Sequence, residues 1–398
     1  MKIIDIIKES IITERTLAGF KVTPIAKINP VDEAIHLNPP HTRLAHDEIS
    51  DYVTRIKTNT KTNKDIRTKP IIHASNVNIV DEHNKQWDLN DLAQQIMARP
   101  NVKSVITSNS KMKKSSDELA RNNKMKKSVT LNEVIFDITL PALAGIVVDE
   151  ETMEFVEVNT CPGAGDCKIF CYARKGGYRM FKHSSMAAAR YLNFLLNDPQ
   201  GFANMVNNQI KNTKSRLDKS HTKLVVRWHD AGDFFSKEYL NLAYNIAKQN
   251  PDVEFYAYTK MAMAVTNDSP PNWLNRFSTG STTHQAQQVH DYEKQGNTVL
   301  KAQVVPQQLF IDLIAKNDGK KVKDESGQLQ FQNNHAVKTF IDRLAKNYNI
   351  DPKTVISYNS IISKPIGKSP KWNVIVPPGA GDLAAKRKDV LNTFLLFH

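Results

Sequence analysis

From residue 129 onward, strand-like runs of apolar residues alternate with runs whose apolar positions recur at helical spacing. The strand-like runs are VTLNEVIFDI, GIVVD, KLVVRWH, VEFYAYT, RFSTG, TVLKAQVV, TVISYNS and WNVIVP. The helical runs are HSSMAAARYLNFLLN, PQGFANMVNNQIKN, SKEYLNLAYNIAKQN and NNHAVKTFIDRLAKNY. Alternation at this interval predicts βα units and a mostly parallel sheet. We therefore expect an α/β fold, a partial or complete parallel βα barrel, over residues 128–398.

The first 127 residues carry a weaker pattern. Residues 1–19 predict an amphipathic N-terminal peptide that must dock on something, because its isoleucines recur at helical spacing. Residues 20–98 mix the strand-like run KPIIHASNVNIV with the helical run LNDLAQQIMAR, and prolines divide the rest into loops. This N-terminal extension is therefore expected to be of mixed α/β and loop structure.

Charge adds a candidate partner. The chain has a net charge of +13, which suits contact with nucleic acid but also suits solubility alone. Residues 99–127 hold nine basic residues and two acidic ones, with few apolar positions. This stretch is expected to be an exposed basic linker or loop. The alternative, which assigns it a function, is that it contacts nucleic acid.

No run of apolar residues approaches the roughly 18 that a membrane-spanning helix needs, and the first residues do not resemble a secretory signal. We therefore expect no membrane partner. The three cysteines are an odd number confined to one short window, which is unlike a disulfide framework and favours a reducing compartment.

These cysteines are the strongest chemical signal. Cys161, Cys167 and Cys171 follow the spacing C-x5-C-x3-C, with Gly163 and Gly165 between the first two. Three thiolates on one short loop can bind three corners of a cubane iron–sulfur cluster and leave its fourth iron open. The glycines let the backbone turn sharply and approach the sulfurs.

Two alternatives remain open at this point. Structural zinc needs four protein ligands, and here His183 or His229 would have to complete the set. The cysteines could also be ordinary buried thiols, although their clustering argues against that reading.

Tyr172, directly after the last cysteine, resembles the aromatic residue that follows the three-cysteine loop of the radical S-adenosylmethionine (radical SAM) superfamily, whose usual spacing is C-x3-C-x2-C. The motifs CPGAGDCKIFCYARKGGYR, VRWHDAGDFFSKEYL, FYAYTK and PPGAGDLAAKRKDV together resemble the phage gene 88 protein family over residues 150–398. The resemblance implies a radical-SAM-like, TIM-barrel-like domain with a 4Fe–4S cluster and S-adenosylmethionine as cofactors. It also suggests a viral source.

The resemblance further implies roles for residues at strand ends. Cofactor binding is expected of Tyr172, His229, Asp230 and Asp233, since carboxylates suit the amino group of S-adenosylmethionine. Asp230 could instead cap the helix that begins near Ser236, or pair with Arg227.

Further candidates follow the later strands. Alternation along FYAYTK places Tyr258 and Lys260 on one face, where Lys260 would suit an anion or would reach the rim. Ser278 ends the next strand and could bind a carboxylate or ribose. The turn containing Gly379, Gly381 and Asp382 could present backbone N–H groups to an anion, or could be a tight turn without a ligand. We expect Asp230, Tyr258 and Lys260 to be the catalytic residues.

Three functions are therefore compared. The first is a radical-SAM-like enzyme of a phage, which forms a 5′-deoxyadenosyl radical, modifies an unknown substrate such as a nucleic acid or nucleotide, and needs an electron donor. The second is a non-catalytic nucleic-acid-binding protein with a structural zinc site, and the third is an electron-transfer protein. The expected location is the cytoplasm of an infected bacterial host. The amphipathic start also resembles phage packaging peptides, so the protein could instead be packaged in the virion.

Overall fold

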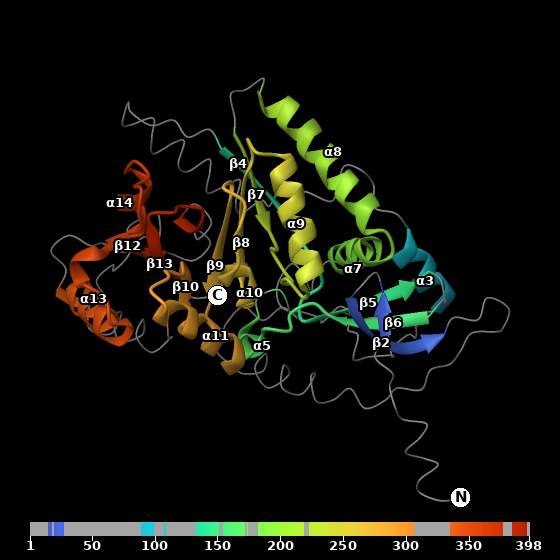
Figure 1. The fold of residues 1–398 in the computed structure, drawn as a ribbon, viewed down its shortest axis with the longest axis horizontal. Coiled ribbons are helices and arrows are strands. Elements are labelled where there is room, and N and C mark those ends of the chain that lie inside the picture. Colours follow the sequence, from blue (N-terminus) through green and yellow to red (C-terminus); the bar gives the residue numbers. More distant parts are fainter. Residues whose placement is uncertain are drawn as a thin grey trace, which may run out of the picture. The chain divides into compact units, whose positions relative to one another are not determined.

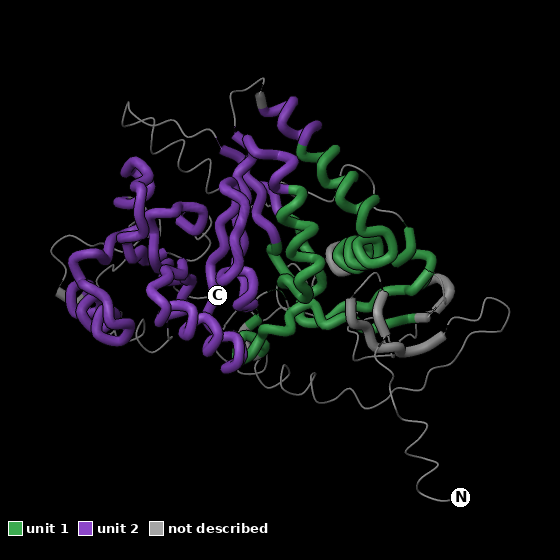
Figure 2. The backbone as a smooth tube through the Cα atoms, in the orientation of Figure 1, with its two compact units in different colours: residues 1–106, 138–210, 229–246 green, residues 107–137, 211–228, 247–398 purple. Residues whose placement is uncertain are grey.

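The computed structural model describes eleven segments of the chain, and these fall into two compact units (Figure 2). Unit 1 comprises residues 1–106, 138–210 and 229–246, and unit 2 comprises residues 107–137, 211–228 and 247–398. The described segments are residues 15–17, 20–27, 89–98, 107–108, 133–150, 154–171, 173, 182–218, 223–305, 335–376 and 384–395.

Unit 1 contains a four-stranded antiparallel sheet of order β1-β2-β6-β5 (Figure 1). Its strands are β1 (Arg15–Leu17), β2 (Phe20–Lys27), β5 (Ala144–Asp149) and β6 (Glu154–Asn159). The register of β2 against β6 shifts between Pro24 and Ala26. A proline has no N–H to give to a ladder, so a bulge beside Pro24 is where a sheet accommodates it.

The helices of unit 1 are α3 (Leu89–Met97), the short α5 (Cys167–Phe170) and α7 (Lys182–Asn197). Helix α8 (Pro199–Asp218) begins in unit 1 and α9 (Lys237–Gln249) ends in unit 2. Asn193 of α7 accepts the N–H of Val148 at 2.9 Å, which fixes the helix on β5. Arg190 donates to the carbonyl of Gln95 at 2.6 Å, which ties α7 to α3. Both side chains therefore fasten α7 to its neighbours.

Unit 2 is built on a nine-stranded sheet of order β11-β12-β13-β10-β9-β8-β7-β4-β3. Each strand from β11 to β7 in this order pairs in parallel with the next one. At the other end of the sheet, β3 pairs antiparallel with β4. The strands are β3 (Thr107–Ser108), β4 (Glu133–Ile138), β7 (Lys223–Trp228), β8 (Glu254–Thr259), β9 (Trp273–Ser278), β10 (Lys301–Val304), β11 (Val355–Ser357), β12 (Trp372–Val376) and β13 (Val390–Leu395).

The two faces of this sheet differ in chemistry. One face, which we call the Arg276 face, carries Tyr256, Tyr258, Leu274, Arg276 and Ala302, and its apolar members join one buried cluster. The opposite face carries stacked aromatic rings, with Phe255 and Trp273 at 5.4 Å and Trp228 at 5.5 Å from Trp273. Alternation along parallel strands produces this separation.

Further elements of unit 2 cover these faces. They are α10 (Met263–Thr266), α11 (Thr283–Lys294), α13 (His335–Tyr348), the 3-10 turn η2 (Pro352–Thr354) and α14 (Tyr358–Ile362). Helix α13 packs Phe340 and Leu344 against Phe394 of β13 and Ile375 of β12.

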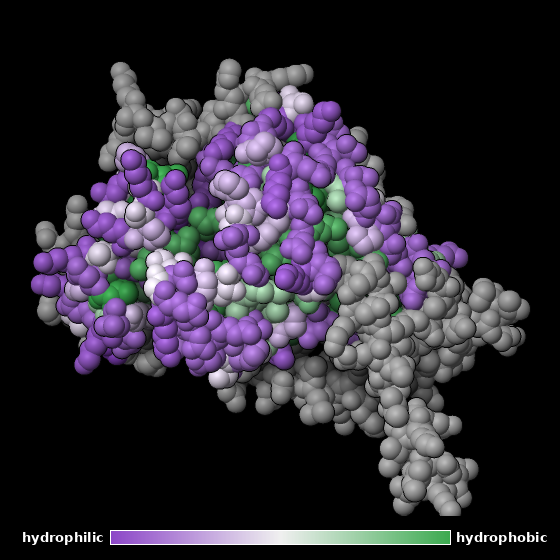
Figure 3. All heavy atoms as spheres, in the orientation of Figure 1, coloured by the Kyte–Doolittle hydropathy of each residue, from purple (hydrophilic) through white to green (hydrophobic). Residues whose placement is uncertain are grey.

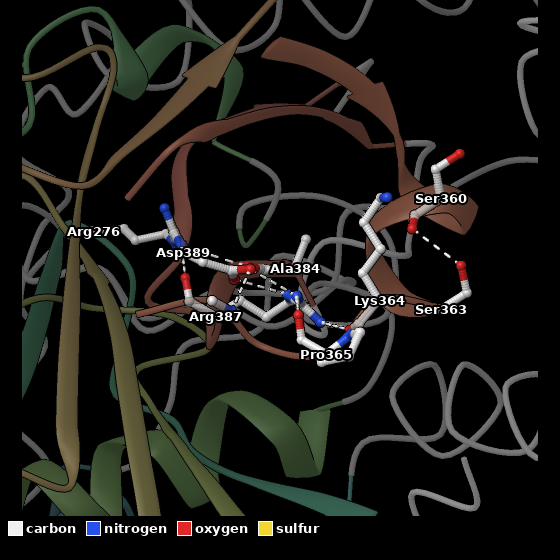
Figure 4. Close-up of polar contacts among 9 residues, drawn as sticks. Arg276, Ser360, Ser363, Lys364, Pro365, Ala384, Arg387 and Asp389 are labelled. Carbon is white, nitrogen blue, oxygen red and sulfur yellow. Dashed lines mark hydrogen bonds and ion pairs between the residues drawn. The ribbon is translucent and has the colours of Figure 1, made fainter. Parts of the chain in front are cut away.

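A buried ion pair fastens the C-terminal segment (Figure 4). Arg387 donates to Asp389 through Nε at 3.0 Å and Nη2 at 2.8 Å, and also donates to the carbonyls of Lys364 and Pro365. Asp389 in turn accepts the N–H of Gly367 at 2.9 Å. This pair therefore holds the chain around residues 364–367 against the turn that precedes β13.

The α/β class and the mostly parallel sheet are confirmed. One expectation was wrong: the run GIVVD is β5 of the antiparallel sheet, because it pairs with β6 and not with the parallel strands. Strands β6 and β13 and helix α11 were not predicted. Among the described strands the order runs from β11 to β3 without a pairing that closes a barrel.

Hydrophilic side chains predominate on the described part of the face drawn in Figure 3. Within the described residues, Ile366 is the exposed large hydrophobic side chain, at 49%. No helix in the described ranges combines the length and hydrophobicity needed to cross a bilayer.

Candidate functional site

The three cysteines lie in unit 1, directly after β6. Each is half-buried, and none forms a disulfide. The chain turns after Cys161, whose carbonyl accepts the N–H of Ala164 at 3.0 Å, and then forms the single-turn helix α5 from Cys167. The three thiols are thus carried on one short, turning segment, as the sequence predicted.

Cys161 receives a backbone hydrogen bond from a strained residue. The N–H of Leu143 donates to Cys161 Sγ at 3.3 Å, and the Leu143 carbonyl accepts the N–H of Thr160. Leu143 has a φ of 67°, a left-handed conformation that is costly for a residue with a Cβ. N–H donation to sulfur stabilises a thiolate or a metal-bound cysteine.

The loop after β7 is hydrogen-bonded to the backbone on either side of β5 and β6. Asp233 N–H donates to the carbonyl of Thr160 at 2.8 Å, one residue before Cys161. Asp230 N–H donates to Ile138, and Ala231 accepts from Leu140, both at 3.0 Å. The loop carrying the predicted aspartates is therefore bonded to the start of the cysteine segment.

Gly232 makes this approach possible. Its φ is +85°, and a Cβ there would lie 2.7 Å from the Cβ of Leu140. A side chain at this position would push the loop away from residues 138–141.

His229 begins the loop and is held by aromatic rings. It is 2% exposed, its Nε2 lies 2.8 Å from the hydroxyl of Tyr239, and its ring meets Phe234 edge to face at 4.6 Å. It also adopts a left-handed φ of 67°. The contact with Tyr239 engages Nε2, so a metal at His229 would have to bind through Nδ1.

The two aspartates of the loop are buried, Asp230 at 7% and Asp233 at 4% exposed. Asp233 Oδ1 accepts the N–H of Phe234 at 2.7 Å. The start of α9 is capped by Ser236, whose Oγ accepts the N–H of Tyr239. Buried carboxylates are costly unless their oxygens are hydrogen-bonded or paired with a cation.

The cysteine segment and the loop after β7 carry side chains that can bind a metal ion, but the described side chains do not form a metal site. Across the described residues, no three side chains of His, Cys, Asp or Glu are gathered as they would be around a metal ion. A cluster bound by the three cysteines would therefore require the segment to close around it.

The remaining candidates lie in unit 2. Tyr258 stacks against the guanidinium of Arg227, with 5.2 Å from Cζ to the ring centroid. Lys260 Nζ lies 3.4 Å from Ser278 Oγ. The expectation that Asp230, Asp233, Tyr258, Lys260 and the cysteines share one cavity spans both units and stays a prediction.

Sequence reasoning missed Leu143 and Arg276. Nothing in the sequence marks Leu143, because its role is its backbone conformation. Arg276 is 1% exposed on the middle of β9, and burial lowers its pKa to about 10, although Tyr258 and Asp389 oppose the shift. A charged residue inside the run WLNRFS was the available signal.

Several predicted features lie outside the described residues. They are Tyr172, Gly379, Gly381 and Asp382, the side chain of His183, residues 1–14 of the N-terminal peptide, and most of the basic stretch 99–127.

Comparison with known proteins identifies a family. No curated protein and no solved structure matches the chain. The sequence profile of the family described as gene product 88 matches residues 104–347, which is more than half of the chain. This range includes the cysteine segment, the loop after β7 and the end of β8. The chain therefore belongs to the gene product 88 family.

Proposed function

We propose that this protein is an iron–sulfur enzyme of the radical-SAM-like type, with Cys161, Cys167 and Cys171 as the cluster ligands. The observation that carries the proposal is the bonded group in unit 1. Leu143 donates to Cys161 Sγ, and the backbone N–H of Asp233 donates to Thr160, so the Cys161 thiol and the loop that carries the buried aspartates belong to one hydrogen-bonded network.

The donor set fits the cofactor in kind. Three half-buried cysteines without a disulfide supply three thiolates, and a fourth iron position would stay open for a substrate or cofactor. When bound, such a cluster supplies an electron to S-adenosylmethionine. Asp230 and Asp233 would hold the amino group of that molecule, because ammonium groups need acceptor oxygens.

A partial βα barrel is part of the same proposal. It is supported by the strands from β4 through β7, β8 and β9 to β10, which are neighbours in chain order. The carboxyl ends of such strands are where barrel enzymes place their working groups. Tyr258 lies near the end of β8 and Lys260 directly follows that strand, and both remain candidate catalytic residues, as does Asp230 after β7.

The proposal implies partners and a setting. An electron donor would reduce the cluster, and the host cytoplasm would supply it. The membership of a phage protein family supports a phage origin. Packaging into the virion through residues 1–15 remains part of the proposal.

S-adenosylmethionine cleavage tests the enzyme proposal. The protein is reconstituted anaerobically with iron and sulfide, reduced with dithionite, and assayed for 5′-deoxyadenosine. We expect cleavage by the wild type, and a loss of at least about tenfold in the double variant Asp230→Asn/Asp233→Asn. A reconstituted protein with an intact cluster and no cleavage would rule out the radical chemistry.

Nucleic-acid binding is a second candidate, favoured by one surface loop. Lys364 and Lys371 both lie over the ring of Trp372, at 5.5 and 5.0 Å, and Lys368 is exposed nearby in the chain. In the described part of the chain no carboxylate pairs with these three lysines. Clustered cations beside an indole suit a phosphate backbone.

Salt-dependent binding tests this second candidate. If the loop contacts phosphates, replacing Lys364, Lys368 and Lys371 with Gln should weaken binding of a single-stranded oligonucleotide and reduce its salt dependence. Unchanged affinity and slope would remove this loop from any nucleic-acid contact.

A further inference from the structure

We propose that Leu143 is a positioning residue of the cysteine site. A strained turn centred on Leu143 aims its backbone N–H at Sγ of Cys161, which fixes this sulfur for metal binding and favours the reduced state of a bound cluster. The inference rests on the proposed function in taking Cys161 as a ligand. It adds a residue that acts through its backbone conformation and not through its side chain.

Leu143 is the centre of a γ-turn. The N–H of Ala144 donates to the carbonyl of Ala142 at 2.8 Å, across Leu143, whose φ is 67°. A γ-turn with a positive φ at its centre is the rare and strained form. Leucine, unlike asparagine or aspartate, has no polar side chain that could compensate for this conformation locally. The strain is therefore maintained by the contacts around the turn.

The turn diverts a hydrogen bond from the antiparallel sheet. Residues 143 and 160 lie opposite each other, one step beyond the pair of Ala144 with Asn159, and the N–H of Thr160 donates to the carbonyl of Leu143 at 3.0 Å. In a regular ladder such a pair exchanges two bonds, so the N–H of Leu143 would donate to the carbonyl of Thr160. It donates instead to Sγ of Cys161 at 3.3 Å. The thiol therefore receives the donor that a regular sheet would use.

Both partners of this bond are held in place. Thr160 is fully buried, and its Oγ1 donates to the carbonyl of Pro141 at 2.7 Å, just before the turn. The N–H of Cys161 donates to Oδ1 of Asn159 at 3.0 Å, and the Cys161 carbonyl accepts the N–H of Ala164 at 3.0 Å. The chain therefore fixes Cys161 at its N–H, its carbonyl and its sulfur.

A donor at this sulfur has two physical consequences. Hydrogen bonds to a ligand orient it, and their loss typically lowers metal affinity by about 10–100-fold. Hydrogen bonds to the sulfurs of an iron–sulfur cluster also set its reduction potential, because they stabilise the reduced state, in which the sulfurs carry more negative charge. A turn that served the fold alone would change neither quantity.

Cobalt(II) titration of the full-length apo protein, followed by thiolate-to-cobalt absorption, tests the inference. Leu143→Gly keeps the N–H and adopts a positive φ without strain, so we expect wild-type affinity. Leu143→Val places a β-branched residue where a positive φ is strongly disfavoured, so the turn should shift and withdraw the N–H from Cys161. We expect its cobalt affinity to fall about tenfold or more.

Asn349→Val is the matched control. Asn349 also has a positive φ, of 50°, but it belongs to unit 2, whereas the three cysteines belong to unit 1. Valine there should lower stability and leave the cobalt affinity unchanged. In the reconstituted protein, the midpoint potential should become more negative in Leu143→Val and stay at the wild-type value in Leu143→Gly.

Equal cobalt affinity in Leu143→Val and Leu143→Gly, or a wild type without thiolate-to-cobalt absorption, would overturn the inference. If Leu143→Val does not fold, Leu143→Ala replaces it in the comparison, because a Cβ alone makes a positive φ costly. An affinity of Leu143→Ala equal to that of Leu143→Gly would then be the contrary result.

The test is separate from that of the proposed enzyme. Cobalt binding requires neither an assembled cluster nor S-adenosylmethionine. A protein that assembles a cluster and cleaves no S-adenosylmethionine would refute the radical chemistry, and the role of Leu143 at Cys161 would still be decided by the cobalt affinities.

Discussion

Leu143 and His229 both adopt a left-handed backbone conformation, with φ of 67° in each. For residues with a Cβ this conformation costs about 1–2 kcal/mol, so it persists only where the surroundings impose it. Asn349 is the other described non-glycine residue of this kind, and it directly follows a helix. Of the two strained residues in unit 1, Leu143 donates to Cys161, and His229 begins the loop whose Asp233 donates to Thr160. Their strain is therefore concentrated where we place the chemistry.

Burial also perturbs the carboxylate of Glu157 in unit 1. Glu157 lies on β6, and desolvation raises its pKa above the ordinary value of 4.5. Between that value and the folded pKa, the folded state binds more protons than the unfolded state, so stability falls as pH rises through this window. Replacement by Gln removes the buried charge.

We therefore expect Glu157→Gln to be more stable than the wild type at pH 7, with a smaller difference near pH 4. Chemical denaturation at both pH values measures this, with the exposed Asp268→Asn as the control. An equal difference at the two pH values would refute burial as the cause.

At the scale of elements, the C-terminal segment of unit 2 depends on the Arg387–Asp389 pair. Asp389 is 1% exposed and Arg387 4%, and together they hold residues 364, 365 and 367 by hydrogen bonds. Removing one partner of a buried pair leaves an uncompensated charge, which costs more than the pair itself contributes.

Asp389→Ala should accordingly lower the free energy of unfolding by about 3–5 kcal/mol. Lys214→Met breaks the exposed pair of Lys214 with Asp252 and should cost less than about 1 kcal/mol. Urea denaturation of both variants makes the comparison. Similar losses in the two would mean that the Asp389 pair is no more important than a surface pair.

Helix α13 ends at Tyr348 and is followed by Asn349, whose φ is 50°. The N–H of Ile350 donates to the carbonyl of Ala345 at 2.9 Å, which is the hydrogen bond of a Schellman end. Glycine adopts this conformation without strain, whereas a β-branched residue does not.

Asn349→Gly should therefore match or exceed wild-type stability, and Asn349→Val should lose about 1–2 kcal/mol. Thermal unfolding of the two variants provides the measurement. If valine were tolerated as well as glycine, the left-handed end of α13 would be in error.

The elements also show what the sequence could predict. Strands β7, β8 and β12 and helices α7, α9 and α13 follow strong periodic patterns, and their positions were predicted closely. Helix α11 was missed because it buries only Val289 among its described side chains and has no apolar stripe. Strand β13 is a short apolar run with buried Asn392 and Thr393, and such runs do not distinguish strand from helix.

Pairing was harder to predict than position. The run GIVVD was correctly predicted as a strand, but its partner β6 and the more distant β2 are set by contacts far apart in the sequence. The same limit applies to the site. The cysteine spacing and the strand-end aspartates could be read directly, whereas the backbone bonds that join them, and the burial of Arg276, depend on the tertiary fold.

On the scale of the whole molecule, the two units carry different parts of the proposed chemistry. Unit 1 holds the thiols and the buried aspartates, and unit 2 holds the candidate residues Tyr258 and Lys260. The residues that the gene product 88 profile matches belong to both units.

Iron and acid-labile sulfide, measured after anaerobic reconstitution, test whether the three cysteines bind an iron–sulfur cluster. We expect about four iron and four sulfide per wild-type chain. We also expect loss of the assembled cluster in Cys161→Ala, Cys167→Ala and Cys171→Ala, because three ligands leave none to spare. Full iron and sulfide in Cys161→Ala, or a colourless wild type with one zinc per chain, would show that the cysteines are not the ligands of a cluster.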